Sequence, residues 1–347
     1  MTPSVATTIR TPDTEGLLVI RNLTTSFPTS GGTINAVDNI SFSVKKGGAV
    51  ALVGESGSGK SMTALSVMRL VPAPGKIASG EIRFRDVDLL KLSDSEMRKH
   101  RGNDIAMIFQ EPMTSLNPVF KVGDQVAEAI VIHRKVNKRE AWKQAGEMLN
   151  LVSIPDPHKR LHDYPHQLSG GMRQRVMIAM ALSCDPDLLI ADEPTTALDV
   201  TIQAQIMELL ARLKEQLGLS LLLITHDLGI VAEFCERVIV MYTGRVVEEA
   251  AVRALFATPK HPYTEGLLKS LPNLAEDATG GPRRLVTIPG MVPDIAALPR
   301  GCKFNPRCPY VMPICLGDEP ARMVVGPDHD ARCYLHGEIA DPERKGA

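Results

Sequence analysis

The chain has 347 residues, of which 44% are hydrophobic and 23% charged, with a formal net charge of −1, as in an ordinary globular protein with one large or two modest domains. This near-neutral charge argues against a nucleic-acid-binding protein, which usually carries a basic surplus. No apolar run approaches the roughly 20 residues that span a bilayer, and the N-terminus lacks the apolar stretch of a signal peptide, so the sequence predicts a cytoplasmic protein whose membrane role depends on partners.

Residues 1–16 are predicted to form a loose tail. Short apolar runs predict strands in the first third of the chain, at residues 17–20, 40–44, 49–53, 80–84 and 105–109. The stretch 28–33, rich in Gly, Ser and Thr, predicts a loop between two of these strands. A helix is predicted to begin at Lys60, directly after a glycine-rich segment.

The middle of the chain, 111–182, is rich in helix formers, and amphipathic patterns predict helices at 126–136 and 138–151. Alternation of strand and helix then returns, with strands predicted at residues 188–191, 220–225, 238–242 and 246–249. A helix is predicted over 201–217, because its apolar residues share one face and Gly218 follows as a natural stop. This order of elements predicts an α/β fold in which a mainly parallel sheet carries helices on both faces.

The composition changes after residue 250, where Pro and Gly become frequent and the periodicity over 299–335 is weak. We therefore expect a core domain over 17–250, with a helical subdomain at about 111–182, and a small appended domain over 251–347. The sequence has no internal repeat.

A glycine-rich segment, 54–61, follows the predicted strand 49–53 and fits the pattern G-x-x-x-x-G-K-[ST] of a phosphate-binding loop. Glycines let backbone N–H groups curl around an anion, and the start of the next helix adds positive potential. Lys60 provides a charge for the β- and γ-phosphates of a nucleotide such as ATP, and the Ser61 hydroxyl is suited to bind Mg²⁺. The predicted nucleotide contacts in and beside this loop are Gly54, Ser56, Gly57, Gly59, Lys60, Ser61 and Met62.

Two consecutive acids, Asp192 and Glu193, follow the apolar strand 188–191 and supply the second half of such a site. Asp192 is predicted to hold Mg²⁺, and Glu193 to orient and deprotonate the water that attacks the γ-phosphate. A chance glycine turn or a pair of solvated acids would explain either motif alone, but their combination favours a nucleotide site. The two motifs leave several classes open, including kinases, GTPases and recombinases.

The deciding motif is the segment 168–175, Leu-Ser-Gly-Gly-Met-Arg-Gln-Arg, which resembles the signature sequence of ATP-binding-cassette (ABC) proteins. The resemblance implies a P-loop NTPase (RecA-like) core with a helical signature subdomain. It also implies that Ser169, Gly170 and Gly171 contact the γ-phosphate of ATP held by the opposite subunit, at a helix N-terminus aimed at an anion. Met172 departs from the Gln of many members, which puts in doubt a contact to the sugar of the nucleotide.

Other family marks appear in the expected order. Gln110 lies where the Q-loop of the family contacts the metal and the attacking water. The segment 196–199 resembles the D-loop, which implies that Asp199 crosses to the partner subunit. His226 is similar to the switch histidine that contacts the γ-phosphate, and Phe27 to the aromatic residue that stacks on adenine, although core packing is an alternative role for Phe27.

Three further segments resemble the bacterial peptide/nickel importer branch, namely 109–118, 261–264 and a cysteine-rich tail, and the similarity is greatest to its "D" ATPase subunit. The resemblance implies an ATP hydrolase that powers uptake of dipeptides or oligopeptides, with nickel, glutathione or another small solute as alternatives. It implies a second ABC ATPase subunit in a heterodimer, two transmembrane permeases and an extracellular or periplasmic solute-binding protein. The chain would then lie peripherally at the cytoplasmic face of the inner membrane. A cassette protein of translation or DNA repair is a further alternative, but those usually carry tandem cassettes or coiled-coil arms.

The tail contains four cysteines, Cys302, Cys308, Cys315 and Cys333, which can complete an all-thiolate site for zinc or a [4Fe–4S] cluster. A reducing cytoplasm argues against disulfides. The spacings are longer than those of most structural zinc sites, and the family resemblance implies a [4Fe–4S] cluster, with zinc and with unliganded thiols or disulfides as the alternatives. We expect such a site to cross-link a tail that has few large apolar residues.

Overall fold

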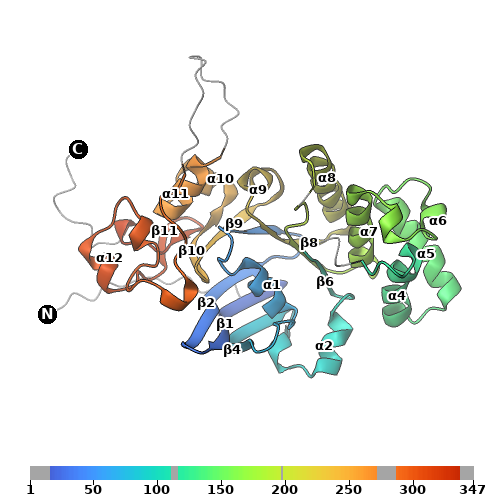
Figure 1. Ribbon diagram of the computed structural model, residues 1–347, viewed down its shortest axis with the longest axis horizontal. Helices are drawn as coiled ribbons and strands as arrows, with labels where there is room; N and C mark the ends of the chain where they lie inside the picture. The colour runs from blue at the N-terminus through green and yellow to red at the C-terminus, as the bar shows by residue number, and fades with distance from the viewer. Residues whose placement is uncertain (1–15, 111–115, 197, 272–286, 337–347) are drawn as a thin grey trace, which may run out of the picture.

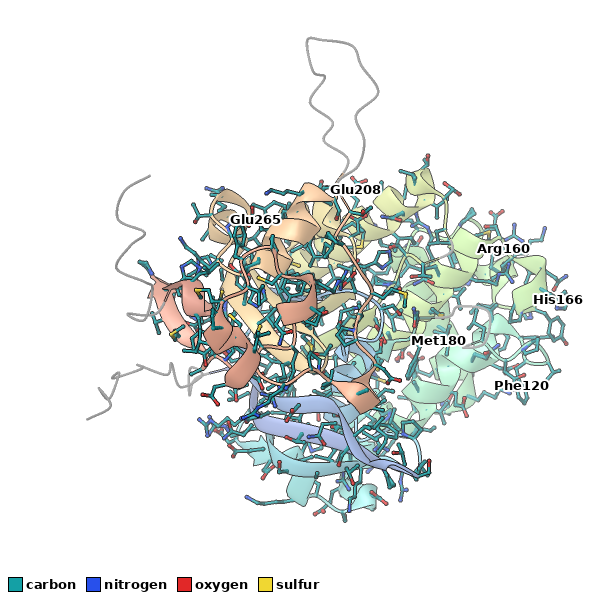
Figure 2. The ribbon with its side chains drawn as sticks, turned by 60° about the vertical axis from the view of Figure 1, so that its left-hand side comes forward. Phe120, Arg160, His166, Met180, Glu208 and Glu265 are labelled. Carbon is teal, nitrogen blue, oxygen red and sulfur yellow. The ribbon has the colours of Figure 1, made fainter. Side chains whose placement is uncertain are left out.

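The computed structural model describes residues 16–110, 116–196, 198–271 and 287–336. The predicted tail, apart from Gly16, lies outside the described residues, as do 111–115 of the importer-like segment and residue 197 of the D-loop. In Figure 1 the helices α4 to α7 and the helices α10 to α12 lie at opposite sides of the central strands. Figure 2 likewise separates Arg160, in the helical part, from Glu265, in the C-terminal part.

The N-terminal strands form an antiparallel sheet of their own with the order β2-β1-β4-β5. Its strands are β1 (Leu18–Thr29), β2 (Gly32–Val44), β4 (Lys76–Phe84) and β5 (Val87–Asp88). The loop predicted over 28–33 is present but shorter, because Pro28 pairs with Thr33 and only residues 30 and 31 form the turn that joins the two strands. The hydroxyl of Thr29 donates to the carbonyl of Gly32 at 2.7 Å across that turn.

A second, larger sheet has eight strands in the described part of the chain, in the order β11-β12-β10-β9-β3-β8-β7-β6. Its strands are β3 (Ala49–Val53), β6 (Ile105–Ile108), β7 (Leu188–Asp192), β8 (Ser220–Thr225), β9 (Arg237–Tyr242), β10 (Arg245–Ala251), β11 (Met323–Gly326) and β12 (His329–Ala331). The strands from β9 to β6 run parallel, whereas β10, β12 and β11 pair antiparallel. The predicted α/β fold is confirmed, and the sheet is mixed rather than mainly parallel.

The two faces of this sheet are covered by different elements. Alternate residues of a strand point to opposite faces, so the contacts of neighbouring residues in β3 show what covers each face. Val50 and Leu52 of β3 belong to a cluster with the antiparallel sheet and with Ala64 and Val67 of α1 (Lys60–Val67). Ala51 and Val53 of the same strand belong to a cluster with the C-terminal elements. Strands buried on both faces need continuous apolar runs, which is the pattern that β3, β7 and β8 show.

The remaining helices have the following bounds: α2 (Asp94–His100), α4 (Val122–Arg134), α5 (Lys138–Leu151), α6 (Pro157–Arg160), α7 (Gly170–Leu182), α8 (Val200–Leu217), α9 (Leu228–Phe234), α10 (Val252–Ala257), α11 (Pro262–Lys269) and α12 (Pro313–Gly317). The predicted helix over 201–217 is confirmed as α8, which ends at Gly218 with a φ of 64°. No helix in the described residues is long and apolar enough to cross a membrane.

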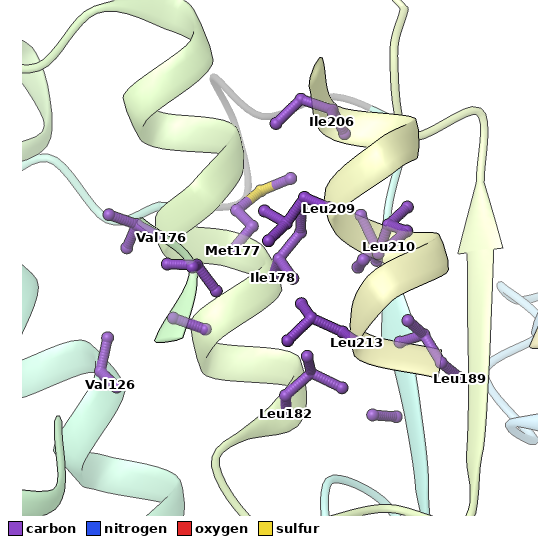
Figure 3. Packing of buried hydrophobic residues seen from close by; sticks show 14 of the residues in the cluster. Val126, Val176, Met177, Ile178, Leu182, Leu189, Ile206, Leu209, Leu210 and Leu213 are labelled. Carbon is purple, nitrogen blue, oxygen red and sulfur yellow. The ribbon is translucent and has the colours of Figure 1, made fainter. Parts of the chain in front are cut away.

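Helix α8 packs against α7 through the apolar face that the sequence predicts. Figure 3 shows the side chains of the two helices meeting above the sheet strand that carries Leu189. The buried residues in this contact are Ile206, Leu209, Leu210 and Leu213 from α8, and Val176, Met177, Ile178 and Leu182 from α7. This contact fixes the N-terminus of α7 relative to the sheet.

The C-terminal elements are attached to the core by sheet pairing and by a buried polar cluster. Strand β12 pairs with β10, so that Ala331 lies opposite Glu248. The carboxylate of Glu248 is fully buried, lies 2.7 Å from Nε2 of His329, and accepts from the backbone N–H of His261 at 2.8 Å. The boundary predicted at residues 250 and 251 falls within β10, and the division into two domains stays a prediction.

The buried imidazole of His261 makes this attachment sensitive to pH. Its Nδ1 accepts the backbone N–H of Tyr263 at 3.1 Å and caps α11. Burial lowers the pKa of His261 from 6.5 to about 4, with Glu248 opposing and with His336 and Arg332 assisting the shift. Between these two pH values the unfolded chain binds more protons at His261 than the folded chain, so stability falls as the pH falls through this window.

We expect the melting temperature to drop between pH 6.5 and pH 4, with His261 contributing a loss of up to about 3 kcal/mol. The matched variant is His261→Asn, because Asn keeps an N-cap oxygen but does not titrate. Thermal unfolding followed by circular dichroism at several pH values measures the effect. The expectation fails if the variant and the natural chain lose stability with the same slope.

Candidate functional site

The glycine-rich segment 54–61 forms a loop between β3 and α1, where its backbone adopts conformations that only glycine tolerates. Gly54 has a φ of 151°, and a Cβ there would lie 2.3 Å from the carbonyl oxygen of Met241. Gly59 has a φ of 98°, and a Cβ there would lie 2.5 Å from the carbonyl oxygen of Ala36. Both positions therefore require glycine to close the loop against the neighbouring backbone.

Lys60 places a buried cation at the floor of this loop. Its Nζ donates to the carbonyl oxygens of Gly54 at 2.7 Å and of Glu55 at 3.0 Å. Burial lowers the pKa of Lys60, while the nearby carboxylates of Glu193, Asp192 and Glu55 oppose that shift. A desolvated ammonium held by two carbonyl oxygens and, at 3.4 Å, by the Ser58 hydroxyl is suited to receive an anionic oxygen.

A cleft of about 250 Å³ opens over the loop. It is lined by Ala36, Ser56, Gly57, Ser58, Gly59, Lys60, Ser61, Met62, Gln110 and Glu193. The cleft thus brings the phosphate loop together with two predicted site residues that are far from it in the sequence, Gln110 after β6 and Glu193 directly after β7.

Ser61 and Asp192 meet beside this cleft. The Ser61 hydroxyl donates to Oδ1 of Asp192 at 3.0 Å, and Asp192 is 3% exposed at the end of β7. Burial raises the pKa of Asp192 to about 6, while the hydrogen bond from Ser61 opposes that shift. A hydroxyl and a carboxylate oxygen are the hard donors that Mg²⁺ prefers, so this pair fits the predicted metal.

Glu193 is held by three side chains. Its carboxylate accepts from Nε2 of Gln110 at 3.0 Å and from the hydroxyl of Thr196 at 2.9 Å, and it lies 3.3 Å from Nδ1 of His226. Burial favours a higher pKa for Glu193, but the hydrogen bonds from Thr196 and His226 outweigh it and lower the pKa. Its backbone has a φ of 46°, an uncommon conformation that concentrates at functional sites. Glu193 is therefore an oriented, ionised carboxylate among the residues that line the cleft.

Comparison with known proteins identifies the class of this site. The family "ABC transporter" matches residues 37–196, and the family "Oligopeptide/dipeptide transporter, C-terminal region" matches residues 247–315. A peptide ABC transporter ATP-binding protein of Sinorhizobium fredii is 51% identical over 95% of this chain and 98% of its own length. The chain belongs to the ABC transporter ATP-binding proteins. The dipeptide transport ATP-binding protein of Escherichia coli is 50% identical over 92% of this chain and 96% of its own length.

Solved structures support the same assignment to the ABC cassette fold. A dimeric ATP-binding cassette in a post-hydrolysis state, bound to ADP and Pi, has a TM-score of 0.62 at 31% identity, covering 68% of this chain and 99% of that chain. A component of an ABC transporter complex from Clostridium perfringens has a TM-score of 0.59 at 29% identity, covering 70% of this chain and 91% of that chain. The chain is therefore an ABC ATPase with an additional C-terminal part.

The ABC signature residues lie outside the cleft. Ser169 caps α7 by accepting the N–H of Met172 at 3.3 Å, and Gly170 and Gly171 begin that helix. Among the described residues that line the cleft, none belongs to the segment 168–175. The signature-like segment thus does not contribute to the chain's own cleft, and within it Ser169 is exposed whereas Leu168 and Gln174 are buried.

Two other predicted contacts are also placed away from the cleft lining. Asp199 caps α8 by accepting the N–H of Ile202 at 3.0 Å. Phe27 lies in β1, and its ring packs so closely on Gly75 that a Cβ there would be 2.3 Å from it. The roles of Asp199 and Phe27 at the nucleotide stay predictions.

Three residues of this ABC site were not predicted from the sequence. Ala36 and Ser58 line the cleft, and Thr196 donates a hydrogen bond to the carboxylate of Glu193. Thr196 follows Glu193 by three residues in one turn, a spacing that could have indicated the contact. Ala36 comes from the second strand of the N-terminal hairpin, and no pattern in the sequence signals its approach to the loop.

The predicted [4Fe–4S] cluster is wrong, and the zinc alternative has no support. Cys302, Cys308, Cys315 and Cys333 are free thiols that line one small pocket, but no group of three or more Cys, His, Asp or Glu among the described residues could hold a metal ion. Burial raises the pKa of Cys302 to about 11 and that of Cys333 to about 12. Cys302 and Cys308 instead pack against an apolar cluster of the C-terminal part.

Proposed function

We propose that this chain binds Mg-ATP at a seam between two cassettes, hydrolyses it there, and so powers import of dipeptides and oligopeptides through partner permeases. The observation that carries the proposal is that only some of the residues expected to act on ATP line this chain's own cleft. The phosphate loop and the base Glu193 share one cleft, whereas the signature residues beginning at Ser169 do not line it. The names of the relatives support peptides as the solute.

Five side chains in and beside the cleft have distinct parts in the proposed hydrolysis, namely those of Lys60, Ser61, Gln110, Asp192 and Glu193. Lys60 and the loop N–H groups bind the phosphates, and Ser61 and Asp192 would hold Mg²⁺. That ion, when bound, neutralises charge on the phosphate oxygens. Glu193 accepts a proton from the attacking water, and its own orientation is maintained by Gln110 and the other hydrogen-bonding partners described above. Closing the seam would exclude bulk water from the γ-phosphate.

The second half of each site would come from another cassette. A helix N-terminus such as that of α7, with Ser169 as its cap, favours an anion by its exposed N–H groups and its dipole. One chain carries one phosphate loop and one signature, so two cassettes must face each other head to tail. The dimeric cassette bound to ADP and Pi supports this arrangement. We expect a sister ATPase as the other cassette, with Asp199 and Phe27 completing the contacts to partner and adenine.

The assembly would lie at the cytoplasmic face of the inner membrane. Two permease subunits would supply the membrane-spanning path, and an extracellular or periplasmic binding protein would deliver the solute. The test is to extract membranes with detergent, purify the complex through a tag on this chain, and reconstitute it in vesicles. We expect two permease subunits to co-purify and a radiolabelled dipeptide to accumulate only with ATP.

Two outcomes separate the parts of this proposal. Uptake of nickel or glutathione without any peptide would replace the solute and leave the ATPase assignment intact. An assembled complex that hydrolyses no ATP in the presence of its loaded binding protein would overturn the proposed function itself.

A further inference from the structure

The second residue of the phosphate loop, Glu55, forms hydrogen bonds with two residues of the C-terminal part of the chain. Its backbone N–H donates to the hydroxyl oxygen of Tyr263 at 2.7 Å. Its carboxylate accepts two hydrogen bonds from Arg307, at 2.7 Å from Nη1 and 3.0 Å from Nη2. Its carbonyl oxygen accepts from Lys60 inside the loop. The backbone and the side chain of Glu55 are thus fixed from both sides.

Arg307 is built into its position rather than resting on the surface. Its side chain is only 3% exposed, and its Nε donates to the carbonyl of Pro289 at 2.9 Å. The guanidinium lies over the ring of Tyr242 at 5.9 Å and over that of Phe304 at 5.8 Å. The hydrogen bonds that Arg307 donates to Glu55 raise the pKa of Arg307 further, so the cation is permanent. A buried bidentate pair of this kind fixes geometry as well as charge.

The charge of Glu55 matters because it lies on a loop that has to receive a polyanion. Its carboxylate is close enough to Lys60 to influence the lysine pKa. An unpaired acid at this position would repel the phosphates of ATP and would compete with them for the lysine. Arg307 neutralises the charge of Glu55 without entering the cleft. Arg307 itself is not among the residues that line the cleft.

We propose that the C-terminal part completes the phosphate loop, with Arg307 as a positioning residue that neutralises and orients Glu55, and with the Tyr263 hydroxyl holding the Glu55 amide. The inference rests on the proposed ATP site and adds a function for the region that follows the cassette. That region then contributes to nucleotide affinity, in addition to any contacts it makes elsewhere in the transporter.

The experiment compares ATP binding to Arg307→Ala, Glu55→Gln and the double variant, using isothermal titration with ATP and Mg²⁺. Arg307→Ala exposes an unpaired carboxylate and weakens binding about tenfold, and the loss shrinks at high salt because the repulsion is screened. Glu55→Gln removes the negative charge and tightens binding about twofold at low salt. The double variant regains most of the affinity that Arg307→Ala loses, a rescue that a purely structural contact would not give.

The matched control is Arg322→Ala, which removes another C-terminal arginine from an ion pair with Asp330 that does not touch the loop. It is expected to lower the melting temperature without changing the affinity for ATP. If Arg307→Ala does not fold, Arg307→Lys keeps the charge without the bidentate geometry and gives an intermediate loss of affinity.

The inference is overturned if the double variant binds ATP no better than Arg307→Ala, or if Glu55→Gln weakens binding as strongly as Arg307→Ala does. Unchanged affinity in both Arg307→Ala and Arg307→Lys would overturn it as well. A natural chain that does not bind ATP at all would instead refute the proposed function, so the two failures can be distinguished.

Discussion

Replacing Glu193 with Gln reduces steady-state ATP hydrolysis by about a thousandfold and leaves ATP binding intact, because a general base contributes roughly that factor. Gln keeps the shape of the side chain and its hydrogen bonds to Gln110 and Thr196, but it cannot take a proton from water. Phosphate release by the assembled complex measures turnover, and titration with ATP measures affinity. We also expect the variant to accumulate as an ATP-bound dimer in size-exclusion chromatography.

Glu208→Gln is the matched control for this substitution. Glu208 is an exposed acid on α8 that does not line the cleft, and its neutralisation should leave turnover unchanged. Near-normal phosphate release by Glu193→Gln would remove Glu193 from the role of base. It would leave the phosphate loop as a nucleotide site with an unidentified proton acceptor.

Replacing Ser169 with Glu reduces hydrolysis by the assembled transporter about a hundredfold, the loss typical of one missing donor to a developing anion. The new carboxylate would face the γ-phosphate bound by the opposite cassette and repel it. Nucleotide binding by the isolated chain is expected to stay normal, because Ser169 does not line its own cleft. Turnover of the complex and ATP affinity of the single chain are therefore measured side by side.

Ser93→Glu provides the control, since Ser93 also caps a helix and is also exposed, but it caps α2 rather than the signature helix. Its effect should be limited to a small loss of stability. If Ser169→Glu hydrolyses ATP as fast as the natural complex, or if it weakens ATP binding to the isolated chain, the shared site between two cassettes is refuted.

Local sequence patterns predict the central elements well. The apolar run 49–53 is β3, a strand that is buried on both faces and is therefore continuously apolar. The amphipathic run that ends before Gly218 is α8, a helix that is buried on one face only. The helix predicted at 126–136 instead begins at Val122 and ends at Arg134. Its start is set by distant carbonyls, because the N–H of Val122 donates to Asp163 and that of Gly123 to Leu161. A tertiary contact of this kind leaves no periodic signal.

In the cysteine-rich tail, the sequence predicted a metal site that the folded chain does not form in its described residues. Four thiols in one stretch are compatible with a metal site on count alone. Among the described residues, however, these thiols do not form a group that could hold a metal ion, and burial raises the pKa of Cys302 and Cys333. Whether a cysteine can act as a ligand depends on geometry and desolvation, and neither can be obtained from spacing.

The phosphate loop, the acid pair of Asp192 and Glu193 and the signature could all be predicted from local sequence, because each is a short contiguous motif. The contact between Glu55 and Arg307, 252 residues later in the chain, becomes visible only in the folded protein. That contact depends on the order of strands in the mixed sheet, which brings the C-terminal elements beside the loop. Pairing between distant segments is set by packing of the whole fold, so a local pattern does not encode it.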